Sequence, residues 1–229
     1  MKKVLLVVGL GPGISSAVAR KFGAAGFSVG LVARHAEALA SAKKALEEKG
    51  VEVATFVADA SDPASIRGAV RAAHDALGPI TVLHWNASGG GQTRDFLTAD
   101  AAAMHQVFDV SVVGLVSAVQ EALPDLKSAE GAVLVTNGAF GELSPQIDAL
   151  AASSGSMGLA LANGAKHKLV GLLAAKLQPE GVYVGEVMVA GTVKGTAWDR
   201  GKATLEASAV ADAFWALYEA RSDVRARVS

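Results

Sequence analysis

The sequence predicts an α/β fold in which one parallel sheet is covered by helices on both faces. Short apolar runs rich in β-branched residues alternate with longer stretches of helical character along the chain. Hydrophobic residues make up 51% of the 229 residues and the mean hydropathy is +0.35, which indicates elements buried on both sides. A glycine-rich turn, GLGPG, directly follows the first apolar run. Together these features are typical of a doubly wound, Rossmann-type domain.

Each element has its own signal. Six apolar runs are predicted strands, at residues 3–8, 28–33, 52–57, 81–86, 132–137 and 182–189. Helices are predicted near residues 14–25, 36–49, 63–77, 99–127, 149–178 and 203–220. Asp62 is a typical N-cap and Pro63 suits the first helical position. Gly50 and Gly181 stand between a helix and the next strand, where a left-handed C-cap is useful. The strict alternation implies right-handed crossovers and parallel strands.

Length and composition predict a single domain over residues 1–229, because a chain of this size buries a full core and no linker interrupts it. The 21 Lys and Arg nearly balance the 22 Asp and Glu without forming a basic stripe, so we expect no nucleic-acid partner. Cysteine is absent and the five histidines lack metal-ligand spacing, so we predict no metal site. The start MKKVLLVV resembles a signal peptide, but the following GLGPG ends its apolar run after Val8. No apolar run in the sequence reaches membrane-spanning length. We therefore expect a cytoplasmic protein without a membrane partner.

The glycine-rich turn predicts a phosphate site. Gly9, Gly11 and Gly13 allow the backbone to turn tightly and to approach a ligand closely. The helix beginning at Ile14 points its amide N–H groups and positive dipole end toward the same place. We expect a dinucleotide at Gly9, Gly11, Gly13 and Ile14, with a plain strand-to-helix connection as the alternative.

Arg34 and His35 follow the second strand, where an acidic residue would accept hydrogen bonds from the adenosine ribose hydroxyls. A guanidinium at this place pairs with a 2′-phosphate instead. The sequence therefore favours NADP(H) over NAD(H), and an ordinary solvated loop charge is the alternative interpretation of Arg34.

Lys166 stands in the middle of the apolar helical stretch 159–177. Steps of three and four residues from Lys166 follow one face of the helix. The residues on that face are apolar or uncharged: Leu159, Ala162, Asn163, Leu169, Val170, Leu173 and Leu177. We expect Lys166 on the buried side of the helix or beside a cavity. A surface lysine whose stem covers apolar residues is the alternative.

The order and spacing of these motifs resemble the short-chain dehydrogenase/reductase family over essentially the whole chain. Gly9, Gly13 and Ser15 fall where that family has Gly-x-x-x-Gly-x-Gly, with the last glycine replaced. Other segments resemble further family motifs: Asp59 after the third strand, Asn86-Ala87-Ser88 after the fourth, Ala190-Gly191-Thr192-Val193 after the sixth, and Lys166 with Gly171 in the long helix. The resemblance implies a small-molecule substrate and a homodimer or homotetramer.

The resemblance also assigns roles to these residues. It implies that Asp59 contacts the adenine ring and that Asn86 and Ala87 lie along the cofactor. The backbone at Gly191 and Val193 would hold the nicotinamide carboxamide, and Lys166 would bind the nicotinamide ribose.

Three of the four catalytic positions of the family are changed in this sequence. Ser111 stands at the asparagine position, Gly138 at the serine position and Ala162 at the tyrosine position, so that only Lys166 is kept. A general acid contributes about 10²–10⁴-fold to a rate and one oxyanion donor about 10²–10³-fold, so ordinary carbonyl reduction should be slow. We expect water to fill the space left at Ala162.

The missing groups have possible replacements. Lys166, a water held by Lys166, or the substrate itself could supply the proton. Hydrogen bonds could come from Asn137, Asn163, Ser153, Ser154 and Ser156. Two functions remain open. One is an NADP(H)-dependent oxidoreductase acting on an unknown carbonyl or alcohol substrate, and the alternative is a catalytically silent NADP(H)-binding sensor or partner protein.

Overall fold

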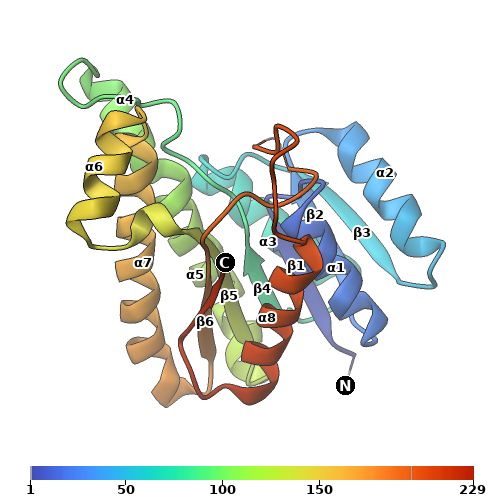
Figure 1. Ribbon diagram of the computed structural model, residues 1–229. Coiled ribbons are helices and arrows are strands. Elements are labelled where there is room, and N and C mark those ends of the chain that lie inside the picture. The colour runs from blue at the N-terminus through green and yellow to red at the C-terminus, as the bar shows by residue number, and fades with distance from the viewer. Residues whose placement is uncertain (1, 197) are drawn as a thin grey trace.

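The computed structural model, which describes residues 2–196 and 198–229, contains a seven-stranded sheet in the order β3-β2-β1-β4-β5-β6-β7 (Figure 1). All six neighbouring pairs are parallel, which confirms the predicted fold class. The strands are β1 (Val4–Val8), β2 (Ser28–Ala33), β3 (Val53–Val57), β4 (Val82–Trp85), β5 (Ala132–Gly138), β6 (Tyr183–Val189) and β7 (Arg225–Val228).

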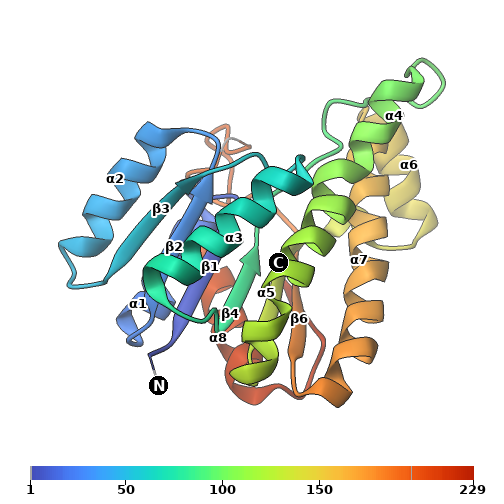
Figure 2. The same cartoon turned by 180° about the vertical axis from the view of Figure 1, so that it is seen from behind.

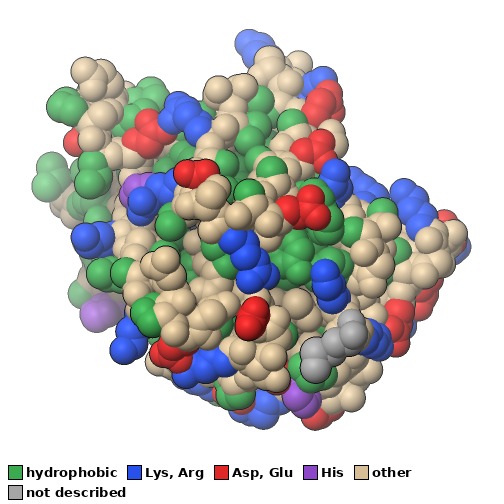
Figure 3. Space-filling view, turned by 90° about the horizontal axis from the view of Figure 1, so that it is seen from below, with side chains coloured by type: hydrophobic (Ala, Val, Ile, Leu, Met, Phe, Trp, Pro, Cys, Tyr) green, Lys and Arg blue, Asp and Glu red, His purple; other side chains and the backbone are tan. Residues whose placement is uncertain are grey.

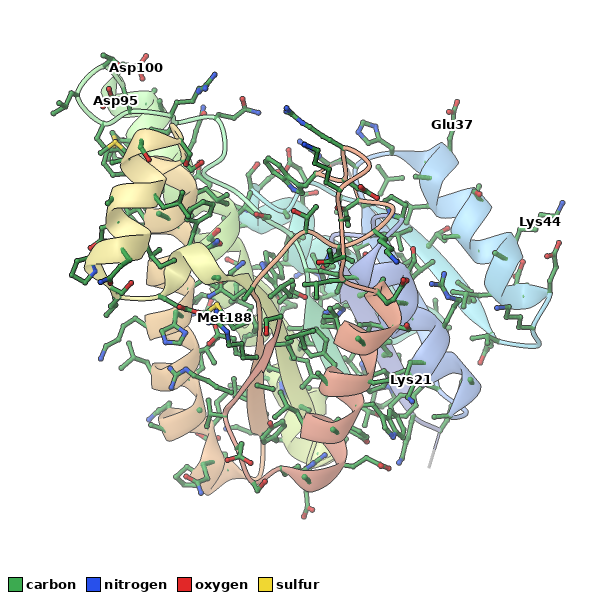
Figure 4. The ribbon with its side chains drawn as sticks, in the orientation of Figure 1. Lys21, Glu37, Lys44, Asp95, Asp100 and Met188 are labelled. Carbon is green, nitrogen blue, oxygen red and sulfur yellow. The ribbon has the colours of Figure 1, made fainter. Side chains whose placement is uncertain are left out.

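Helices cover both faces of the sheet. One face carries α1 (Ile14–Ala24), α2 (Ala36–Glu47) and α8 (Ala207–Ala220), which lie in front in Figure 1. The other face carries α3 (Pro63–Leu77), α5 (Leu115–Ser128) and α7 (Met157–Leu177), which come to the front in Figure 2. The strands are apolar on both sides because each face packs on its own helix layer: Leu5 and Val7 belong to one core, and Leu6 and Val8 to the other. Lys21 of α1 pairs with Asp212 of α8 at 2.7 Å, and Figure 4 shows Lys21 between these helices.

Several predicted boundaries hold. Asp62 accepts a hydrogen bond from the Ala64 amide at 2.9 Å, with Pro63 as the first residue of α3. Gly50 and Gly181 both have a φ of +77°, as their C-cap roles require. The predicted helix 203–220 begins later, at Ala207.

Two long predicted helices are each divided. The stretch predicted as 99–127 consists of α4 (Ala101–Phe108), the π-helical segment η1 (Asp109–Gly114) and α5. The stretch predicted as 149–178 consists of α6 (Pro145–Ser153), α7 and the 3₁₀ turn η3 (Gln178–Glu180). A 3₁₀ turn, η2 (Ala139–Gly141), links β5 to the α6 region. α4 and α6 lie beside the carboxyl edge of the sheet, whereas η3 follows α7 at the opposite edge, directly before β6.

Sequence reasoning did not predict β7. Its sequence, RARV, alternates over only four residues, which is too short for a periodic signal. The strand pairs with β6 at the edge of the sheet and is partly exposed, so its arginines are compatible with a strand.

The continuous helical segment 101–128 is long and apolar enough to cross a membrane by those two criteria alone, contrary to the sequence expectation. In the fold its α5 part packs on α3 and β4, and Leu115, Ala118 and Leu126 are buried in the core. This is the environment of a core helix in a globular domain. Over the face seen in Figure 3, acidic and basic side chains are interspersed and do not form a region of one sign.

Candidate nucleotide-binding site

A cavity of about 280 Å³ opens where the carboxyl ends of β1, β2, β3 and β4 meet. This is the edge at which open parallel sheets bind ligands. The cavity brings together six of the predicted cofactor residues, which come from four separate loops: Gly9, Arg34, His35, Asp59, Asn86 and Ala87. The remaining predicted residues lie outside its lining.

Gly9 is required by close packing at the end of β1. Its φ is +89°, and a Cβ on Gly9 would lie 2.4 Å from the Ala87 backbone nitrogen. The Asn86 side chain donates to the Gly9 carbonyl at 3.0 Å, which joins the turn after β1 to the loop after β4. The floor of the cavity is therefore fixed by backbone contacts that only a glycine permits.

The rest of the turn is held by serines at the start of α1. The Gly11 amide donates to Ser15 Oγ at 2.8 Å, and Ser16 Oγ donates to the Gly11 carbonyl at 2.6 Å. Gly13 is buried, and a Cβ on it would lie 2.5 Å from the Thr196 methyl carbon. The segment after β6 thus crosses over the N-terminus of α1, beside Ile14.

Arg34 and Asp59 are exposed on the rim of the cavity, at the ends of β2 and β3. Hydrogen bonds from the Ser61 amide and hydroxyl, at 2.9 and 2.8 Å, hold the pKa of Asp59 below its ordinary value, and the charge of Arg34 lowers it further. Arg34 forms no ion pair with another residue among 2–196 and 198–229. Its guanidinium is available to an anion.

Lys166 lies on the buried side of α7, as expected, with 2% of its surface exposed. Burial lowers the pKa of Lys166 to about 8, against the opposing negative charge of Glu186. Lys166 does not line the 280 Å³ cavity, so it belongs to a second region farther along the same edge.

Of the other three positions named from the family pattern, the loop of residues 88–91 packs against Ser111 and Ala162, and Gly138 faces Asn163. A Cβ on Gly90 would lie 2.4 Å from the Gly158 carbonyl oxygen and 2.8 Å from Ala162 Cβ. Ala162 is fully buried and faces this loop. Ser111 Oγ is buried and has no hydrogen-bond partner among the described residues. A Cβ on Gly138 would lie 2.8 Å from the Asn163 amide nitrogen.

Gly191 and Val193 lie on the α1 and α8 side of the edge. A Cβ on Gly191 would lie 2.9 Å from a Leu205 methyl carbon, and Val193 forms a parallel bridge with Leu205. The Val193 carbonyl accepts from the Thr196 hydroxyl at 2.7 Å. The segment after β6 is thus folded back on itself above the turn after β1.

A buried polar cluster beside Lys166 was missed by sequence reasoning. The Glu186 carboxylate on β6 is completely buried and accepts from Asn137 Nδ2 at 2.6 Å. Its second oxygen lies 2.6 Å from His167 Nδ1 and 3.3 Å from Arg225 Nε. The available signal was a lone acidic residue inside the apolar run VYVGEVMV, which is unusual for a strand buried on both faces. We call Glu186, Asn137, His167 and Arg225 the Glu186 cluster.

The comparisons with known proteins agree with this geometry. The short chain dehydrogenase family model matches residues 3–204. A putative ketoacyl reductase of the granaticin polyketide synthase of Streptomyces violaceoruber is 34% identical over 194 residues, or 81% of this chain and 66% of that protein. The putative ketoacyl reductase of the monensin polyketide synthase of Streptomyces virginiae is 34% identical over 81% of this chain and 69% of that protein. The chain thus spans about two thirds of these relatives.

Solved structures share the whole fold. An NADPH-bound short chain oxidoreductase of Pseudomonas aeruginosa PAO1, described as containing an atypical catalytic center, has a TM-score of 0.85 at 21% identity. That likeness covers 99% of this chain and 95% of the other. A short-chain dehydrogenase/reductase of Serratia marcescens BCRC 10948 has a TM-score of 0.84 at 21% identity over 99% and 96% of the two chains. With the family match over residues 3–204, these findings show that the chain belongs to the short-chain dehydrogenase/reductase family.

Proposed function

We propose that this protein is an NADP(H)-dependent oxidoreductase acting on a small carbonyl or alcohol substrate. The observation that carries the proposal is the cationic Arg34 beside Asp59 at the rim of the cavity after β1, β2 and β3. An arginine at this position suits a 2′-phosphate, which distinguishes NADP(H) from NAD(H). The NADPH named for the Pseudomonas aeruginosa structure supports the same choice.

The residues at the edge of the sheet fit the two halves of such a cofactor. Gly9 lacks the Cβ that would fill the cradle against Ala87, and the amides at the start of α1 suit the pyrophosphate. We assign the pyrophosphate to Gly9, Gly11, Gly13 and Ile14, the 2′-phosphate to Arg34 and His35, and the adenosine to Asp59, Asn86 and Ala87. Lys166 holds the nicotinamide ribose, and the backbone of Gly191 and Val193 holds the carboxamide.

The chemistry on the protein side depends on Lys166. When bound, the reduced nicotinamide supplies a hydride, and the product oxygen then needs a proton. Ser111, Gly138 and Ala162 replace the asparagine, serine and tyrosine of the family pattern, so none of them serves as the usual acid. Lys166, with its pKa lowered to about 8, is protonated near neutral pH and is suited to donate at its Nζ.

A second candidate function is a catalytically silent NADP(H)-binding sensor or partner protein. The packing of Gly90 on Gly158 and Ala162 favours it, because the loop occupies the place from which a tyrosine would reach the substrate. For either function we propose a cytoplasmic homodimer or homotetramer.

The test separates the two functions. The protein is titrated with NADPH and with NADH while nicotinamide fluorescence is followed. Turnover of NADPH is then measured over aldehydes, ketones including β-keto thioesters, and activated alkenes. Tight NADPH binding with turnover supports the oxidoreductase, and binding without turnover supports the silent protein. No binding of either nucleotide contradicts both.

A further inference from the structure

The carboxylate of Glu186 lies in the core, where burying a charged group costs free energy. It is completely buried, and removing a charge from water costs several kcal/mol unless partners replace the lost hydration. Three donors do so here: Asn137 at 2.6 Å, His167 at 2.6 Å and Arg225 at 3.3 Å. These three contacts replace the hydration that the buried carboxylate has lost.

The Glu186 cluster connects the surface to the region of Lys166. His167 is the neighbour of Lys166 on α7, and its side chain is 27% exposed. Arg225 on β7 is 45% exposed and also donates to the His167 carbonyl at 3.3 Å. Asn137 donates to the Asn163 carbonyl at 3.0 Å, one turn before Lys166. The cluster therefore ties β5, β6 and β7 to the α7 turn that carries the lysine.

Glu186 is the charged group that acts on Lys166. The helices and turns packed against α7 also carry charged or titratable residues: Asp109 on η1, His105 on α4, Asp148 on α6 and Glu180 on η3. Glu186 differs from them in lying 2.6 Å from His167, the chain neighbour of Lys166, and its negative charge raises the pKa of Lys166 against the larger effect of burial. On α7 itself, His167 faces Glu186, whereas Lys168 is exposed.

We propose that Glu186 and Arg225 are positioning residues that set the charge of Lys166. Glu186 supplies the buried negative charge that keeps the lysine an ammonium ion, and Arg225 partly neutralises that charge from the surface. The assignment rests on the hydrogen bonds from the cluster to His167 and to the Asn163 carbonyl, in the turn of α7 that carries Lys166. Its consequence for catalysis rests on the proposed function, in which Lys166 holds the nicotinamide ribose and donates a proton.

The proposal predicts shifts of opposite sign. Glu186→Gln removes the anion, so Lys166 should lose its proton at a lower pH. Arg225→Gln removes a competing cation from Glu186, so Lys166 should lose its proton at a higher pH. The matched control is Arg227→Gln, two residues along the same strand, because Arg227 pairs with Glu142 instead of Glu186. A purely structural role would not produce opposite shifts.

The measurement is an NMR pH titration of the ligand-free protein labelled with ¹³C at lysine Cε. The Lys166 signal is assigned by its loss in Lys166→Met. Glu186→Gln should lower the midpoint and Arg225→Gln should raise it, each by more than about 0.5 pH unit, while Arg227→Gln leaves it in place. Unchanged midpoints, or shifts of the same sign, would overturn the proposal. If Glu186→Gln does not fold, the two arginine variants decide between these outcomes.

A second arm separates this proposal from the proposed function. NADPH affinity is measured against pH in the parent protein and in the Arg225→Gln variant. If NADPH binds, the pH at which its affinity falls should move upward with the lysine midpoint. If NADPH does not bind the parent protein, the proposed function fails while the titration of Lys166 still tests the role of the cluster.

Discussion

At the scale of single residues, the proposed cofactor site carries one exposed arginine on its rim. Arg34 lies on the cavity rim at the end of β2, and the other rim charge is the carboxylate of Asp59. A 2′-phosphate placed between them would be attracted by the Arg34 guanidinium and repelled by the Asp59 carboxylate. Under the proposed function, the position of Arg34 relative to Asp59 would therefore decide between NADPH and NADH.

Replacing Arg34 with Asp should reduce or reverse the preference for NADPH over NADH. Charge-assisted hydrogen bonds contribute about 1.5–3 kcal/mol, so NADPH affinity should fall by roughly 10–100-fold while NADH affinity changes little. Fluorescence titration with both nucleotides measures this. Arg20→Asp, the same charge change at an exposed position of α1 outside the cavity, is the control. Equal NADPH and NADH affinities in the parent protein would contradict the role of Arg34.

Lys166 and Lys168 offer a matched pair on one helix, because Lys166 is buried and Lys168 is exposed. Lys166→Met keeps most of the length and bulk and removes the donors. It should weaken NADPH binding by about 1–3 kcal/mol, the cost of a lost charged hydrogen bond. Lys168→Met should have almost no effect. Equal effects of the two changes on the dissociation constant for NADPH would show that Lys166 contributes no more to binding than Lys168 does.

At the scale of elements, the loop of residues 88–91 and the start of α7 behave as one unit. The Gly158 amide donates to the Thr93 carbonyl at 2.9 Å, and the bare α-carbons of Gly90 and Gly158 allow the two backbones to touch. Ala162 completes the contact one turn later. The small residue at the family's tyrosine position, Ala162, therefore leaves room for the loop that packs against it.

Reintroducing the family side chains should consequently fail to restore the usual active site. Ala162 is fully buried and faces Gly90, so a tyrosine at position 162 would need room that the loop now restricts. The Cβ of a serine at position 138 would lie 2.8 Å from the side-chain nitrogen of Asn163. We expect Ala162→Tyr with Gly138→Ser to lower the melting temperature and to leave NADPH turnover on a reactive carbonyl unchanged. Gly138→Ser alone should be tolerated better, because the Asn163 side chain can move. A stable double variant with raised turnover would contradict this expectation, because it would show that the loop of residues 88–91 moves to admit the larger side chains.

The sequence predicted the elements better than their contacts. Apolar runs of six to eight residues located six strands because all of them except β3, at one edge of the sheet, are largely buried, but the four residues of β7 carry no periodic signal. The turn at Gly9 was predictable because its chemistry is local. The contact of Gly90 with Gly158 joins residues far apart in the chain, and the partners of Glu186 come from three other elements, β5, α7 and β7. No local pattern encodes such contacts, although the lone Glu186 in an apolar strand was a visible sign.

At the scale of the whole molecule, two apolar layers sandwich the sheet, and polar groups inside them must be satisfied or kept neutral. His84 on β4 is completely buried between β1 and β5, with Nε2 at 3.1 Å from Thr136 Oγ1 and its ring edge-on to Phe214. Like its neighbour Trp85, His84 belongs to the core. Desolvation lowers the pKa of His84 to about 3.

The buried neutral His84 predicts how the whole fold responds to acid. Its ordinary pKa is 6.5 and its folded pKa is about 3, so the unfolded chain takes up the proton first as the pH falls. The stability linked to His84 is therefore complete above pH 6.5 and is lost progressively toward pH 3, by up to about 1.4 kcal/mol per pH unit. Urea unfolding between pH 7.5 and 4.5 should show this decline in the free energy of unfolding, and His84→Gln should make the decline smaller. The control is His105→Gln on the exposed side of α4, which should keep the parent dependence of the free energy of unfolding on pH. Equal slopes in the parent protein and in His84→Gln would mean that other groups govern the acid sensitivity.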